Sequence, residues 1–134
     1  MTIDVPAPVS TARLWTGRIL GYLPAAMLLF GGVANISKLD FIVQETIKNG
    51  FNPDTMVPLG IVTVISALLY LIPKTEVIGA ILITGYMGGA VAVHYLMKND
   101  PLPQVLTPAI FAAVIWLGLV LRNDRVMALM PWRR

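Results

Sequence analysis

The sequence VIGAILITGYMGGAVAVHYLM, residues 77–97, decides the fold of this chain. It carries the only histidine of the protein, no acidic or basic residue besides, and enough apolar length to cross a bilayer. A hydrocarbon core of about 30 Å takes about 20 apolar residues in a helix, and lipid leaves a lone segment no other way to satisfy its backbone. We therefore predict a transmembrane helix here, with Gly85, Gly88 and Gly89 near its middle and His94 near one end.

Three further apolar runs lie outside this stretch, at about residues 19–37, 56–72 and 104–121. Charged residues make up 13% of the 134-residue chain and lie almost entirely between the runs. A soluble domain carries about a quarter charged residues. We expect an all-α protein, an integral membrane four-helix bundle, in which residues 1–134 form a single membrane domain.

The basic residues predict how the bundle is oriented, because four spans put both termini on the same side. Seven Lys and Arg residues fall on that side and three on the other, namely Arg13, Arg18, Lys74, Arg122, Arg125, Arg133 and Arg134 against Lys38, Lys48 and Lys98. The positive-inside rule then places both termini in the cytoplasm. We expect a multi-pass protein of the cell membrane, a bacterial inner membrane, with residues 122–134 as a basic tail on its surface.

The composition also excludes several kinds of chemistry. The chain has no cysteine and a single histidine, so neither a metal site nor an iron–sulfur cluster is expected. Its net charge of +3 comes from residues that flank the spans, so the expected partner is the lipid bilayer and not nucleic acid. No complete catalytic motif is present, so catalytic residues stay unassigned and the sequence leaves open whether the protein is an enzyme.

The connections between the runs carry their own signals. Residues 40–50 predict a short amphipathic helix on the outer membrane surface, ended by Asn49-Gly50. Asn52-Pro53-Asp54 predicts a turn into the second span. Residues 73–76, with the sequence PKTE, predict a tight turn, which makes the second and third spans antiparallel neighbours.

Small residues gather on one face of the third span, namely Gly85, Gly88, Gly89 and Ala92. Gly85 and Gly89 have the small-xxx-small spacing that lets two helices approach closely. The favoured interpretation is a helix-packing surface, used within one chain or between chains. The alternative is that these glycines make room for a ligand.

Three polar side chains lie near the outer ends of the predicted helices. Asn35 and Lys38 are at the end of the first span, and His94 is near the end of the third. The first span carries these two residues on one face together with Pro24, Leu28 and Gly31. One interpretation is structural, with Lys38 in an interfacial ion pair and His94 hydrogen-bonded. The other is an outward-facing ligand-binding pocket formed by Asn35, Lys38 and His94.

The chain resembles the DoxX-like family of small four-helix membrane proteins. The segments that carry the resemblance are residues 71–75 (LIPKT), 79–82 (GAIL) and 84–90 (TGYMGGA), followed by His94 and by residues 116–119 (WLGL). The resemblance extends from about residue 19 to the end of the chain. It implies four spans with both termini inside, in agreement with the charge count.

The resemblance also implies a range of functions. Some relatives are subunits of a quinone-linked thiosulfate oxidoreductase, and others are associated with redox or stress protection. This chain departs from the family at two positions. Thr63 stands where similar members often carry a carboxylate, and Leu96 stands where they often carry an arginine, so a Glu–His–Arg site is incomplete here.

Two hypotheses for the function follow. The first is an auxiliary redox-associated subunit or small enzyme that binds a lipophilic molecule, such as a quinone, in the outward-facing pocket. The second is a non-enzymatic scaffold or homo-oligomer packed through the glycine face. A transporter or channel is disfavoured, because no charged residue lies in mid-membrane.

Overall fold

The computed structural model describes residues 10–97 and 101–129 as a set of helices without a strand. They are α1 (Thr11–Ile36), α2 (Asp40–Lys48), a short 3-10 helix η1 (Pro53–Thr55), α3 (Met56–Leu71), α4 (Glu76–Leu96), α5 (Leu102–Arg122) and α6 (Asp124–Leu129). Four of them, α1, α3 with η1, α4 and α5, are long and apolar enough to cross a membrane. The prediction of an all-α protein with four spans is therefore confirmed. The side that the termini face stays a prediction.

The helix α1 begins well before the predicted start of the first span, at about residue 19. Ser10 caps it, because its Oγ accepts a hydrogen bond of 3.2 Å from the backbone N–H of Arg13. An N-cap provides a hydrogen-bond acceptor for the first N–H groups of a helix whether or not its first turns are apolar. The helix therefore begins before the apolar stretch does. Pro24 lies inside α1 and is buried.

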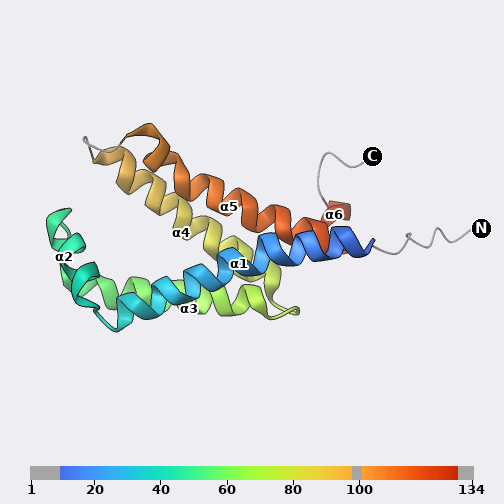
Figure 1. Cartoon of the computed structure of the whole chain (residues 1–134), viewed down its shortest axis with the longest axis horizontal. Coiled ribbons are helices and arrows are strands. Elements are labelled where there is room, and N and C mark those ends of the chain that lie inside the picture. Colours follow the sequence, from blue (N-terminus) through green and yellow to red (C-terminus); the bar gives the residue numbers. More distant parts are fainter. Residues whose placement is uncertain (1–9, 98–100, 130–134) are drawn as a thin grey trace, which may run out of the picture.

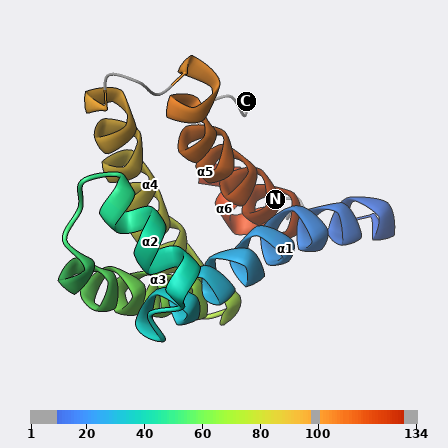
Figure 2. The same cartoon turned by 60° about the vertical axis from the view of Figure 1, so that its left-hand side comes forward.

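The four long helices form a ring of neighbours. The helix α1 packs against α3 and α5, and α4 packs against the same two helices, so that α1 and α4 lie diagonally opposite. Turning the ring between Figure 1 and Figure 2 shows that the α4–α5 pair approaches α1 where α1 begins and diverges from α1 and α3 toward α2. We call the first end the terminal end and the second, which carries α2, the loop end.

The core lies between the helices and is built largely from Ala, Val, Ile and Met, with one tyrosine. Tyr70, Ile83, Ile115 and Leu119 are fully buried. The outward faces are apolar too: Phe30 is 72% exposed and Ile110 is 61% exposed. Large exposed apolar side chains on every span are expected when lipid is the solvent.

Glycines allow the closest helix contacts, and they are not the ones that the spacing pattern singled out. An added Cβ on Gly118 would lie 2.7 Å from the Cα of Gly21, and one on Gly60 would lie 2.8 Å from Ile36. By contrast, nothing lies within 4 Å of an added Cβ on Gly85, Gly88 or Gly89. Within the chain this face of α4 is therefore not packed against a helix. Packing between chains stays a prediction.

The connecting segments agree in part with expectation. The helix α2 forms where the amphipathic segment was predicted and is followed by Gly50, whose φ of +82° ends it. The predicted tail at residues 122–134 is wrong at its start, because Arg122 ends α5 with its side chain only 4% exposed and residues 124–129 form α6. Residues 130–134 of that tail lie outside the described residues.

Candidate functional site

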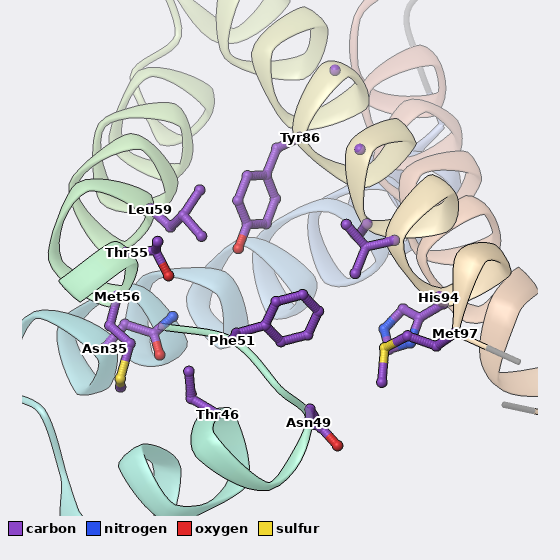
Figure 3. A pocket seen from close by; sticks show the side chains of 14 residues that line it. Asn35, Thr46, Asn49, Phe51, Thr55, Met56, Leu59, Tyr86, His94 and Met97 are labelled. Carbon is purple, nitrogen blue, oxygen red and sulfur yellow. The ribbon is translucent and has the colours of Figure 1, made fainter. Parts of the chain in front are cut away.

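A cavity of about 540 Å³ lies at the loop end, between α1 and α3 on one side and α4 on the other. The segment with α2 and Phe51 closes part of its mouth (Figure 3). Its polar lining residues are Asn35, Thr46, Asn49, Thr55, Tyr86 and His94. The rest of the wall is apolar side chains and glycine backbone.

The helical period of α4 explains how one helix supplies so much of this wall. Tyr86, Ala90, Val93 and Met97 recur at intervals of three and four residues, so they share one face. Gly85 and Gly89 border this face on one side and His94 borders it on the other. Because neither glycine has a side chain, the cavity extends to the backbone of α4. All four small residues are exposed, and Gly85 and Gly89 line the cavity whereas Gly88 and Ala92 do not.

The structure brings Asn35 and His94 to the same cavity, on opposite walls. Asn35 is on the last turns of α1 and His94 on the last turn of α4, and both are partly buried. In Figure 3 the ring of Tyr86 extends from α4 between them, with its hydroxyl directed into the cavity. Tyr86 was not singled out from the sequence. Its signal was its place between Gly85 and His94 on one helical face.

Lys38 does not line this cavity. It follows the end of α1 with a φ of +50°, and its Nζ lies 3.8 Å from Oδ1 of Asp54. The two side chains are 43% and 85% exposed. Of the two interpretations of Lys38, this geometry agrees with an interfacial ion pair and separates it from Asn35 and His94.

A second, smaller cavity of about 240 Å³ adjoins the first and shares Asn35 and Tyr86 with it. Its other lining residues are Met27, Leu28, Gly31, Thr63 and Phe111. Thr63 donates its hydroxyl to the carbonyl of Leu59 at 2.8 Å, so it offers the cavity little polarity. The face of α1 that carries Leu28, Gly31 and Asn35 therefore borders internal space, as expected for a face turned to the bundle.

At the terminal end the structure places a polar cluster that sequence reasoning missed. Arg122 donates to Glu76 at 3.2 Å and to the hydroxyl of Tyr70 at 2.9 Å, and its guanidinium lies over the rings of Tyr22 and Tyr70. Asn123 also donates to Glu76. The available signal was that Glu76 and Arg122 flank apolar runs at the same end of a four-span bundle.

This cluster joins helices rather than forming a pocket. The side chains of Arg122 and Glu76 are 4% and 10% exposed, and Tyr70 donates to the carbonyl of Ile115 at 2.7 Å. Hydrogen bonds and an ion pair thus connect α3, α4 and α5. Neither of the two cavities above reaches the cluster, and only its Tyr22 lines a further, open cavity along the start of α1. We assign it a structural role.

The cavity at the loop end has the chemistry of a binding site for a neutral molecule. Among the described residues that line it there is no carboxylate, ammonium or guanidinium group. Within residues 10–97 and 101–129 no three His, Asp or Glu side chains are grouped so that they could hold a metal ion. Amide, hydroxyl and imidazole groups remain, and these donate and accept hydrogen bonds.

Comparison with known proteins adds the family. Searches of curated proteins and of solved structures give no match. A family model described as the DoxX-like family matches residues 19–118, which is well over half of the chain and includes most of each long helix. The chain therefore belongs to the DoxX-like family.

Proposed function

We propose that this DoxX-like protein binds a lipophilic molecule, such as a quinone, in the cavity at the loop end. The observation that carries the proposal is the cavity of about 540 Å³ with apolar walls and amide, hydroxyl and imidazole groups from four segments. Small-molecule sites are typically clefts of about 300–1,000 Å³ with mostly apolar linings and a few polar groups that fix orientation. The association with redox chemistry, as an auxiliary subunit or small enzyme, comes from the family.

The polar groups suit a molecule with carbonyl oxygens. The amide of Asn35, the hydroxyl of Tyr86 and the imidazole of His94 can all donate hydrogen bonds. A neutral ring can enter such a site without the cost of burying a charge. The glycine backbone at Gly85 and Gly89 leaves room for a flat ring to lie against α4.

The test compares glycine variants of one helix in the full-length protein, purified in mild detergent. Gly89→Leu puts a side chain into the cavity, whereas Gly88→Leu adds the same side chain on an exposed position outside it, and both backbones have space for a Cβ. We expect mass spectrometry to find a co-purified lipophile in the wild type and in Gly88→Leu. It should be lost in Gly89→Leu and reduced in His94→Ala.

Equal retention by Gly89→Leu and Gly88→Leu would place any bound lipid outside the cavity and reject the proposal. If the wild type is empty, a methoxylated benzoquinone is titrated into it. A bound quinone should raise the unfolding temperature of the wild type and leave Gly89→Leu unchanged. Absence of any shift in the wild type would also reject a quinone site.

A second function rests on a separate observation, the open face of Gly88 and Ala92. These two exposed residues make no close helix contact in the chain, and small residues allow helices of two chains to approach. We propose a homo-oligomer or partner scaffold as the alternative. Gly88→Leu should then reduce the mass of the detergent-solubilised particle to that of a monomer, whereas Gly89→Leu acts mainly on the cavity. A monomeric wild type without a partner would eliminate it.

We propose that the protein lies in a cell inner membrane with both termini on the cytoplasmic side. This orientation rests on the distribution of Lys and Arg. The absence of cysteine makes a direct test simple, because each introduced cysteine is unique. Lys48→Cys on α2 and Arg125→Cys on α6 are both at exposed positions. An impermeant maleimide should label Lys48→Cys in intact cells and Arg125→Cys only after permeabilisation. The opposite pattern would invert the topology.

A further inference from the structure

The two cavities share two lining residues but differ in chemistry. Asn35 and Tyr86 border both, so the second cavity continues from the polar region of the first. Beyond these two residues its wall is apolar: Met27, Leu28, Gly31 and Phe111, together with Thr63, whose hydroxyl is already donated to Leu59. A cavity with several hydrogen-bonding side chains therefore continues into one that adds only apolar groups and the already bonded Thr63.

The outer edge of the second cavity faces the membrane environment. Met27 on α1 is 59% exposed, and Phe111 on α5 is partly buried. The helices α1 and α5 touch through Gly21 and Gly118 closer to the terminal end and diverge beyond that contact, as Figure 1 shows. The second cavity lies between these two helices, since residues of both α1 and α5 line it.

We infer that the ligand has a neutral hydrogen-bonding head and a single apolar chain, with the head in the first cavity and the chain in the second. This inference rests on the proposed function and adds the class of ligand to it. A molecule with a polar head alone would leave the second cavity unfilled. A neutral head suits this lining, because the described residues contribute no carboxylate, ammonium or guanidinium group to it.

The direction of entry follows from the same geometry. A tailed lipid resides in the bilayer, and the edge between Met27 and Phe111 is the place where its chain can remain in apolar surroundings while its head moves inward. The apolar chain of the ligand leaves contacts with lipid tails and makes contacts with protein side chains instead. Both surroundings are apolar, so the gain comes from packing and not from the hydrophobic effect. The second cavity therefore selects the chain by shape.

The test uses two probes on full-length protein in mild detergent: a methoxylated benzoquinone without a tail and the same ring with a decyl tail. Gly31→Leu fills the second cavity, since nothing lies within 4 Å of an added Cβ at Gly31. Gly88→Leu is the matched control, with the same substitution at an open glycine outside both cavities. The decyl probe partitions into micelles to the same extent with both variants, so this partition does not affect the ratio of their affinities.

We expect Gly31→Leu to bind the decyl probe about fivefold more weakly than Gly88→Leu does, because only packing contacts are lost. The affinity for the tailless probe should be the same in both variants. Met27→Trp, at the exposed outer edge, should act in the same direction if Gly31→Leu does not fold. Monodecanoylglycerol tests whether the ligand is an acyl lipid and not a quinone. If Gly31→Leu weakens binding of this probe but not of the decyl quinone, the ligand is an acyl lipid and the inference is still supported.

The outcomes separate this inference from the proposed function. If Gly89→Leu abolishes binding of the decyl probe but Gly31→Leu and Met27→Trp have no effect, the head site stands and the chain site is rejected. If neither quinone probe nor monodecanoylglycerol binds the wild type, the proposed function and this inference both fail.

Discussion

The two ends of the bundle use the same residue types in opposite ways. At the terminal end Gly21 and Gly118 bring two backbones into contact, and an ion pair between Arg122 and Glu76 is almost fully buried. At the loop end the glycines of α4 border empty space, and the ion pair between Lys38 and Asp54 is exposed. The helices α1 and α3 stay in close contact at the loop end too, where Gly60 meets Ile36, so the loop end differs by the space that it leaves in front of α4.

The largest effect should come from the buried ion pair. Glu76→Gln removes the charge that neutralises Arg122, and an uncompensated buried charge costs about 3–5 kcal/mol. We expect a loss of that order in the free energy of unfolding, measured by denaturation in mixed micelles. The double variant Glu76→Gln/Arg122→Met should recover part of the loss. A loss below about 1 kcal/mol for Glu76→Gln would mean that the terminal end is not held together by this pair.

A smaller effect should distinguish the glycines of the two ends. Gly118→Ala forces a Cβ toward the backbone of Gly21, and overpacking of this kind costs about 1–3 kcal/mol. Gly88→Ala adds the same methyl group in open space, where replacing glycine within a helix should stabilise by up to about 1 kcal/mol. Unfolding temperatures that move in opposite directions would sharpen the comparison. Equal shifts would contradict it.

The smallest effect is expected at the exposed ion pair. Asp54→Asn removes the partner of Lys38, but exposed pairs are screened by water and contribute about 0–1 kcal/mol. We expect a change of less than about 0.5 kcal/mol in the free energy of unfolding, measured as for Glu76→Gln. A loss comparable to that of Glu76→Gln would show that the loop end is as tightly held as the terminal end.

Part of the fold could be predicted because it depends on local properties. The four spans, the helix α2 and its end at Gly50 follow from hydropathy, from the helical period of apolar residues and from turn chemistry. These properties depend only on residues that are close in sequence. Hydropathy predicts a span from about residue 19 but not the start of the helix, which lies at Thr11 because Ser10 caps it there.

The candidate site was only partly accessible from the sequence. Asn35 and His94 could be assigned to the same end of the bundle from the span topology, and the structure places both on one cavity. Lys38 was grouped with them because it lies three residues after Asn35, but the end of α1 separates it from them. Tyr86 had a local signal in its place between Gly85 and His94, whereas the second cavity depends on the angle between helix pairs, which no local pattern encodes.

The sequence by itself determined that the chain is a four-span membrane protein of the DoxX-like family, because length, hydropathy and motif are properties of the chain alone. Only the tertiary structure decided which glycines pack and which leave space, and that Arg122 is buried against Glu76 rather than lying in a surface tail. The physical reason is that the role of a glycine or an arginine depends on which residues of another helix lie opposite it. Those residues are determined by the angle and position at which the helices cross.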